Sequence, residues 1–386
     1  MDGPAPTSPQ PEGVKPRRGA GRMVVPIAVL AILAVGAVGA LGAGPWLRSA
    51  VRSAIDPASG TTPRPAGQTG SSTPTANASG ASALSPAAGA GASGGPGVPA
   101  ATPGLLTDAP WLAWRPSGHG SIVRFQLPAP WVGGTATKIT VAAYLPPEYA
   151  TSGRSYPVIY EAPFGYGAWE KYIQIRSDLD SLITSGAIPA SIVVFVPQIY
   201  SPIVYTECAN SRDGRVSFET FLSGPLVEAV DARYRTIAKA AARAVAGFSE
   251  GGFCAAMLVL RHPDVFTTAL AVSGYFEAGI RTAETPNAWR VFGGNRAYEA
   301  GFSPVLLVGR LTAAQRSAVS IELEADPKQQ FYGPQYEMMV AAAKAAGVSV
   351  VTEPMVGYHS WAIVKAVLPR MLQALGAHEV ALGVFG

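Results

Sequence analysis

A serine in a glycine-rich pentapeptide is the most informative chemical feature of the chain. Ser249 stands between Gly247 and Gly251 in the pattern G-x-S-x-G, after an apolar stretch at 243–248 and before helix-forming residues at 253–261. Where a strand turns this sharply into a helix, only glycine fits on either side, and the serine hydroxyl is held above the sheet edge at a helix N-terminus. The context predicts a nucleophile for acyl transfer. The competing interpretation is a structural turn in a chain with 43 glycines.

A serine nucleophile of this kind needs a base, and His359 is the candidate. In hydrolases that present serine on such a turn, the order along the chain is nucleophile, acid, base. His359 lies late, in a turn after the apolar stretch 348–352, where its imidazole can swing over the serine and take its proton. A helix cap or a surface histidine is the alternative. His262, before a proline at a helix end, and His378, near the C-terminal end, are weaker candidates.

The acid that orients the histidine is predicted from its place after the next-to-last apolar strand. A carboxylate on the loop that follows this strand can hold the far nitrogen of the imidazole. Asp326 follows the stretch 319–323 and precedes Pro327, which stops the strand. Glu324 is the alternative acid, because a shift of two residues would place it at the strand end. We expect Asp326 to fill the role.

Two backbone N–H groups must also point at the carbonyl oxygen as it becomes negative. One is expected from Glu250, the residue after the nucleophile. The other is expected from the turn after residue 160, where Gly165 is best placed and Pro163 cannot donate. The glutamate at position 250 is a departure, because a carboxylate that pointed inward would oppose the negative charge of the oxyanion.

Apolar stretches alternate with helix-forming ones over most of the chain after residue 120. The predicted strands are 121–127, 138–145, 157–160, 191–196, 243–248, 267–272, 319–323 and 348–352. The predicted helices are 168–183, 219–234, 253–261, 333–346 and 360–375. This alternation predicts an α/β fold with a mostly parallel central sheet and helices on both faces. Reactive side chains should then gather at the carboxyl ends of the strands.

Several motifs recur in the order found in a known family. They are 156–160 (YPVIY), the helical stretch 221–234 with 230–235 (VDARYR) at its end, the serine turn at 246–252, 260–266 (LRHPDVF) and 272–276 (VSGYF). Together they resemble the putative-esterase family, which includes esterase D (S-formylglutathione hydrolase), feruloyl and related carbohydrate esterases, and the secreted mycolyltransferase antigens. The resemblance covers about 121–375 and implies an α/β-hydrolase fold with a Ser, acid, His triad.

Aromatic residues near the expected site are candidates for substrate binding. Tyr166 and Trp169 follow the predicted oxyanion turn, and Trp361 matches a family tryptophan just after the histidine. Scattered aromatic residues are also common in a hydrophobic core, which is the alternative. The histidines show no metal-ligand spacing, so we expect neither a metal nor another cofactor.

The N-terminal part of the chain differs from the rest. Residues 1–22 are a basic tail, and 23–43 are uncharged, mostly apolar and long enough to cross the roughly 30 Å hydrocarbon core of a membrane. We expect a signal anchor with the tail in the cytoplasm; a cleaved signal peptide is the alternative. Residues 44–104 form a Pro-, Ala-, Gly-, Ser- and Thr-rich linker expected to be disordered. Residues 105–386 form the esterase domain, which we place outside the cytoplasm.

The charge of the domain bears on its possible partners, and its two cysteines predict a disulfide. Seven basic and three acidic residues precede residue 105, which accounts for the whole net charge of +4. The domain is therefore neutral overall, and nucleic acid is not an expected partner. In an exported domain disulfides persist, so Cys208 and Cys254 are expected to form a bridge between a polar loop and the serine helix. Two buried thiols are the alternative.

Three functions remain compatible with these features. The first is a membrane-tethered serine esterase that hydrolyses small-molecule or cell-envelope esters outside the cytoplasm. The second is an acyltransferase with the same triad, which passes the acyl group to a sugar or lipid hydroxyl. The third is a non-catalytic protein that binds the cell envelope, an interpretation motivated by Glu250 and the altered oxyanion turn. The sequence favours the first.

Overall fold

A single sheet of eight strands organises the computed structural model, which describes residues 108–129, 138–162, 169–170, 173–197, 206–280 and 288–385. The strands are β1 (Ser121–Pro128), β2 (Lys138–Leu145), β3 (Val158–Glu161), β4 (Ile192–Phe195), β5 (Arg243–Phe248), β6 (Thr268–Val272), β7 (Ser320–Glu324) and β8 (Ser349–Thr352). Their order across the sheet is β1-β2-β4-β3-β5-β6-β7-β8. β2 is antiparallel to both its neighbours, and every pair from β4 to β8 is parallel. The predicted mostly parallel sheet is confirmed.

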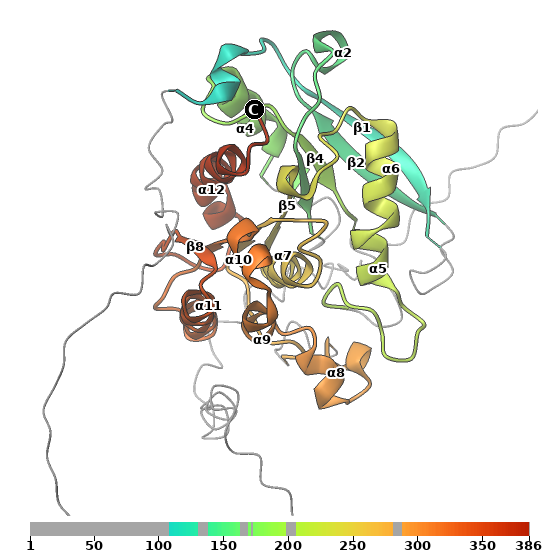
Figure 1. The fold of residues 1–386 in the computed structure, drawn as a ribbon, viewed down its shortest axis with the longest axis vertical. Helices are drawn as coiled ribbons and strands as arrows, with labels where there is room; N and C mark the ends of the chain where they lie inside the picture. The colour runs from blue at the N-terminus through green and yellow to red at the C-terminus, as the bar shows by residue number, and fades with distance from the viewer. Residues whose placement is uncertain are drawn as a thin grey trace, which may run out of the picture. The chain divides into compact units, whose positions relative to one another are not determined.

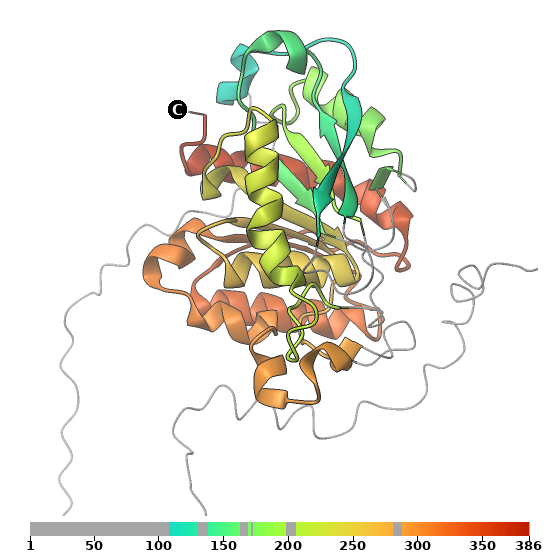
Figure 2. The ribbon, with the colours of Figure 1, turned by 90° about the vertical axis from the view of Figure 1, so that its right-hand side faces the viewer.

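Helices cover both faces of this sheet (Figures 1 and 2). The α-helices are α2 (Tyr149–Ser152), α4 (Ile175–Thr184), α5 (Phe218–Ser223), α6 (Pro225–Arg233), α7 (Glu250–Arg261), α8 (Arg296–Ala300), α9 (Pro304–Leu307), α10 (Ala313–Ala318), α11 (Tyr332–Ala346) and α12 (Trp361–Ala381). Short 3₁₀ turns are η1 (Pro110–Ala113), η2 (Ala240–Ala242), η3 (Ala288–Phe292) and η4 (Val308–Arg310).

Side chains that alternate along the strands build a separate core on each face. On β5, Val245 faces a core shared with α5, α6, α7 and α11, while Ala244 and Ala246 face a core shared with α4 and α12. This is the period-two pattern of a strand that is buried on both sides. The near-continuous apolar runs in the sequence are explained by this double burial.

The stretch 219–234, predicted as one helix, forms two. α5 ends before Gly224, whose backbone (φ −128°, ψ −94°) is not helical, and α6 begins at Pro225. Proline suits the first position of a helix because its missing N–H would have no intrahelical acceptor there. The two helices therefore meet at this Gly-Pro pair.

The three N-terminal regions predicted at 1–22, 23–43 and 44–104 lie outside the described residues, and so do residues 105–107 of the domain. Among the residues that the structure describes, none of the helices combines the length and the apolarity needed to span a membrane.

Candidate active site

Ser249 occupies a strained turn between β5 and α7. Its backbone has φ 59° and ψ −119°, a conformation that costs a non-glycine residue about 1–3 kcal/mol and that occurs mainly at functional sites. A Cβ added at Gly247 would lie 2.3 Å from the carbonyl carbon and oxygen of Gly251, so the first glycine of the pattern is a steric requirement. Ser249 donates its backbone N–H to Val272 on β6 at 2.9 Å, which anchors the turn to the neighbouring strand.

The turn also places a helix N-terminus beside the serine. Ser249 is the N-cap of α7, and Glu250 is the first helical residue, where backbone N–H groups have no acceptor within the helix. Such a position favours a developing negative charge. The predicted second donor, Gly165, lies outside the described residues. Of the two expected donors, only Glu250 lies among the described residues.

His359 packs between two aromatic rings. Its ring centroid lies 4.3 Å from that of Phe248, the residue before the serine, and 4.0 Å from that of Tyr332, with the latter rings nearly parallel. Neither ring nitrogen has a hydrogen-bond partner among the described residues. Burial lowers the pKa of His359 to about 3, so the imidazole is neutral at physiological pH.

Asp326 is bonded to the loop that carries His359. Its Oδ2 accepts the backbone N–H of Gly357 at 3.0 Å, and its Oδ1 accepts that of Lys328 at 2.9 Å. The Gln329 side-chain amide donates to the carbonyl of the same Gly357. The hydrogen bonds from Lys328 and Gly357 hold the pKa of Asp326 below its usual value, so the carboxylate is ionised. Asp326 thus lies at the base of the histidine turn, although no hydrogen bond joins it to the imidazole in the described part of the chain.

Glu324, the alternative acid, faces a different partner. It is the last residue of β7, and its Oε2 accepts the hydroxyl of Ser273, which follows β6, at 3.1 Å. Burial raises the pKa of Glu324 to about 7, although the hydrogen bonds from Ser273 favour its ionised form. Of the two candidate acids, it is Asp326 that contacts the His359 turn.

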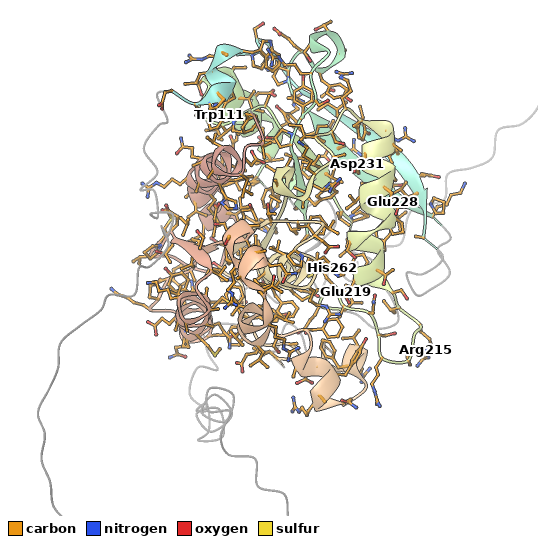
Figure 3. The ribbon with its side chains drawn as sticks, in the orientation of Figure 1. Trp111, Arg215, Glu219, Glu228, Asp231 and His262 are labelled. Carbon is orange, nitrogen blue, oxygen red and sulfur yellow. A yellow bond between two sulfur atoms is a disulfide. The ribbon has the colours of Figure 1, made fainter. Side chains whose placement is uncertain are left out.

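His262 has a structural environment. At the C-terminal end of α7 its Nε2 lies 2.8 Å from Oε1 of Glu219 on α5, and Arg261 donates to the same carboxylate (Figure 3). Burial raises the pKa of Glu219, but the hydrogen bonds from His262 and Arg261 outweigh it and leave the pKa below its usual value. His262 therefore ties the end of α7 to α5.

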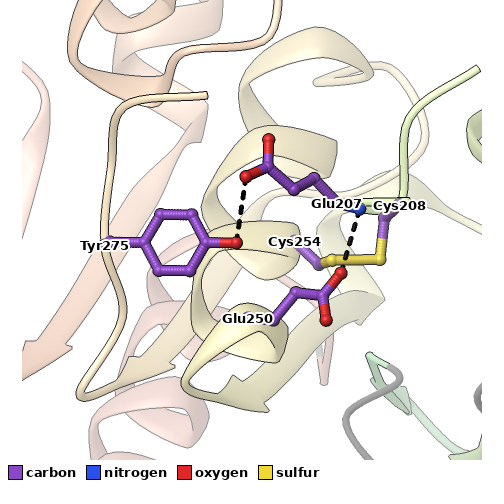
Figure 4. The surroundings of a disulfide bond; sticks show 5 residues. All are labelled: Glu207, Cys208, Glu250, Cys254 and Tyr275. Carbon is purple, nitrogen blue, oxygen red and sulfur yellow. Dashed lines mark hydrogen bonds between the residues drawn. A yellow bond between two sulfur atoms is a disulfide. The ribbon is translucent and has the colours of Figure 1, made fainter. Parts of the chain in front are cut away.

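The predicted disulfide is present. Cys208, in the loop after β4, is bonded to Cys254 on α7, with the Cα atoms 5.6 Å apart (Figure 4). Beside it the Glu250 carboxyl is buried and accepts the backbone N–H of Glu207 at 2.9 Å. Glu250, whose carboxylate would oppose the oxyanion if it pointed inward, is thus hydrogen-bonded to the loop that carries Cys208.

The three candidate aromatic residues have different surroundings. Tyr166 lies outside the described residues. Trp169 is buried in the α4 and α12 core, and its backbone N–H donates to Oε1 of Glu161 at 3.1 Å. Trp361 is half-buried, with its ring centroid 4.8 Å from that of Phe248. Their role in substrate binding stays a prediction.

Two features of the histidine turn have no clear signal in the sequence. Val356 and Tyr358 are strongly exposed, at 74% and 91%, on the loop that carries His359. Tyr332 stacks on one face of the His359 ring, and its place shortly after Asp326 is the one sequence signal that could have identified it. Within the described ranges there is no group of three or more His, Cys, Asp or Glu side chains that could hold a metal ion.

Comparisons with known proteins agree with this architecture. The family model described as Putative esterase matches residues 133–373. Esterase MT1326 of Mycobacterium tuberculosis (strain CDC 1551 / Oshkosh) is 33% identical over 134 residues, or 35% of this chain. The chain spans 28% of the length of that relative.

Solved structures share the fold. A ferulic acid esterase has a TM-score of 0.57 at 22% identity, covering 67% of this chain and 98% of that chain. An S-formylglutathione hydrolase from Agrobacterium tumefaciens has a TM-score of 0.54 at 14% identity, covering 69% and 98%. At these identities the likeness shows an α/β-hydrolase type of fold. Because the family model spans more than half of its residues, the chain belongs to the Putative esterase family.

Proposed function

We propose that the chain is a serine esterase that hydrolyses carboxylic esters through Ser249, His359 and Asp326. The observation that supports this most is the Ser249 turn, where a non-glycine residue at φ 59° caps the helix that begins with Glu250. Strain of this kind at a helix N-terminus presents a nucleophile and an oxyanion donor together. The family of the chain agrees with such chemistry.

The proposed reaction has two acyl-transfer steps. His359 removes the hydroxyl proton of Ser249 as the oxygen attacks the ester carbonyl, and the Glu250 N–H stabilises the oxyanion. The imidazolium then gives its proton to the departing alcohol, which leaves an acyl-serine. Water, deprotonated by His359, attacks this acyl-serine; the carboxylic acid leaves and the serine regains its proton.

Asp326 is proposed to position His359 in this cycle. Its ionised carboxylate holds Gly357, two residues before the histidine, and a negative charge there stabilises the imidazolium that forms. Catalytic hydrogen bonds are often unformed without substrate, so the proposal requires the His359 ring to leave its place between Phe248 and Tyr332 when it bonds Ser249 and Asp326. Neutral imidazole, as burial dictates, is the form that can act as base.

A single substitution tests the nucleophile. Ser249→Ala should fold and lose hydrolysis of p-nitrophenyl esters by at least about three orders of magnitude in kcat, because the acyl-serine cannot form. Ser273→Ala is the matched control, since Ser273 also has a positive φ (45°) at the end of a neighbouring strand. The control should stay within severalfold of the wild type. Equal activity of the Ser249 variant and the wild type would refute the proposal.

We further propose that this domain acts outside the cytoplasm, tethered to the membrane by 23–43 through the linker 44–104. Two features support the proposal: the uncharged apolar run with basic residues before it, and the disulfide, which persists in oxidising compartments. An exported esterase would encounter esters of small molecules or of the cell envelope.

A further inference from the structure

One buried carboxyl cluster ties together three segments near the carboxyl edge of the sheet (Figure 4). Glu207, after β4, donates its backbone N–H to Oε1 of Glu250 on α7 at 2.9 Å. The Glu207 carboxyl accepts the hydroxyl of Tyr275 at 3.1 Å and the backbone N–H of Gly279 at 2.8 Å, both after β6. The hydrogen bond between Glu207 and Glu250 therefore joins this cluster to α7, the helix that follows Ser249.

The loop that Glu250 holds is strained. Glu207 and Cys208 have φ values of 47° and 53°, and such backbone persists only where the surrounding contacts over-determine it. The Cys208–Cys254 disulfide and the Glu250 hydrogen bond both fix this loop to the first turns of α7. Movement of the Glu250 side chain would release one of them.

The two carboxyls lie where a negative charge is costly. Glu207 and Glu250 are 0% and 3% exposed, and neither pairs with a Lys, Arg or His side chain in the described part of the chain. Oε2 of Glu250 has no hydrogen-bond partner there. The charges of Glu250 and, from α8, Glu299 oppose the ionisation of Glu207. The hydrogen bonds act in the other direction: those from Gly279 and Tyr275 favour an ionised Glu207, and the one from the Glu207 N–H favours an ionised Glu250.

Burial raises the pKa values of Glu250 and Glu207 by different amounts. It raises the pKa of Glu250 to about 7, whereas burial raises that of Glu207 well above its usual range despite the hydrogen bond from Gly279. Glu250 therefore ionises first as the pH rises. Its charge would then sit on the same residue whose backbone N–H faces the oxyanion.

We propose that Glu250 is a proton-controlled positioning residue: its carboxyl oxygen holds the disulfide loop on α7, its neutral form keeps negative charge away from the oxyanion, and its ionisation slows acyl transfer by placing a charge there. The inference builds on the proposed esterase function. With increasing pH, kcat/KM should first rise as His359 loses any proton it carries. It should then fall as Glu250 ionises, with the fall centred near pH 7.

The pH profile of Glu250→Gln tests this role. Glutamine keeps an acceptor for the Glu207 N–H but cannot ionise, so the variant should lack the alkaline fall. At about pH 8.5 its kcat/KM for a p-nitrophenyl ester should exceed that of the wild type by about tenfold. Glu250→Met, which has a similar shape and no acceptor oxygen, should be slower than Glu250→Gln at every pH, because the loop loses its anchor.

Two controls separate the possible outcomes. Glu228→Gln, on the exposed face of α6, makes the same charge change and should keep the wild-type profile. Glu324→Gln removes the other carboxyl with a pKa raised to about 7 and should leave the alkaline fall in place. A fall that persists in Glu250→Gln, while a serine-directed phosphonate still labels Ser249, overturns this inference alone. A wild-type protein that the phosphonate does not label overturns the esterase function and this inference together.

Discussion

At the scale of single residues, the assignment of the acid depends on which carboxylate holds the turn of His359. Asp326 accepts the N–H of Gly357, and hydrogen bonds keep its pKa low, so it can stabilise a histidine that gains a proton. Glu324 instead accepts the hydroxyl of Ser273, and burial raises its pKa to about 7. The two residues are two positions apart in the sequence, yet their surroundings shift the pKa values of their carboxyls in opposite directions.

The comparison of Asp326→Asn with Glu324→Gln tests that assignment. The first should lower kcat by about two to four orders of magnitude, because a neutral amide cannot stabilise the imidazolium. The second should change kcat by less than about tenfold. Melting temperatures of both variants would show whether folding, rather than chemistry, is affected. The reverse ranking of the two activities would transfer the role to Glu324.

The strands and the turns that carry the candidate reactive residues could be predicted, because both have local signatures; the catalytic roles of these residues stay predictions. The G-x-S-x-G context marked Ser249, and chain order marked His359 and Asp326. The partners of buried carboxyls could not be predicted, since they come from distant segments. Glu250 looked like an obstacle to catalysis, but its oxygen accepts the N–H of a residue 43 positions away, and the ring of Tyr332 stacks on that of His359.

At the scale of elements, the packing of α12 on β7 buries two carboxyls that form no ion pair with a Lys, Arg or His side chain of the described residues. Glu322 and Glu379 are each 1% exposed, and both oxygens of Glu322 lack a hydrogen-bond partner among the described residues. Burial raises the pKa of Glu322 well above its usual value, and the charges of Glu353 and Glu379 raise it further. The native state therefore binds the proton of Glu322 more tightly than the unfolded state does.

This packing makes stability depend on pH. The contribution of Glu322 to the free energy of unfolding is fully present below the pKa that this residue has in the unfolded state, about 4.5. It is lost as the pH rises toward the higher pKa of the folded state. Glu322→Gln cannot ionise, so at about pH 8 it should be more stable than the wild type by at least about 1 kcal/mol. The advantage should shrink toward about pH 4.5, whereas exposed Glu337→Gln should show no such trend. Thermal unfolding over this pH range measures the stability difference between Glu322→Gln and the wild type. A stability difference that does not change with pH would contradict the expected role of Glu322.

At the scale of the whole molecule, the proposed tether joins the esterase domain to a membrane. The protein should fractionate with membranes, because 23–43 is apolar and uncharged. Protease added outside spheroplasts should cut within 57–104 and release an active fragment, since that stretch has hardly any residue able to build a core. Recovery of a soluble protein whose mature N-terminus lies near Leu41 would instead establish a cleaved signal peptide.

The central claim, that Ser249 is the nucleophile of an esterase, is tested most directly by locating a covalent adduct. The wild-type protein should react with a fluorophosphonate in one-to-one stoichiometry, and peptide mass spectrometry should place the adduct on Ser249, because only a serine beside a base and an oxyanion site reacts readily. Ser249→Ala should remain unlabelled, and Ser273→Ala should label like the wild type. An adduct on another residue, or no adduct on a folded protein, would contradict the account.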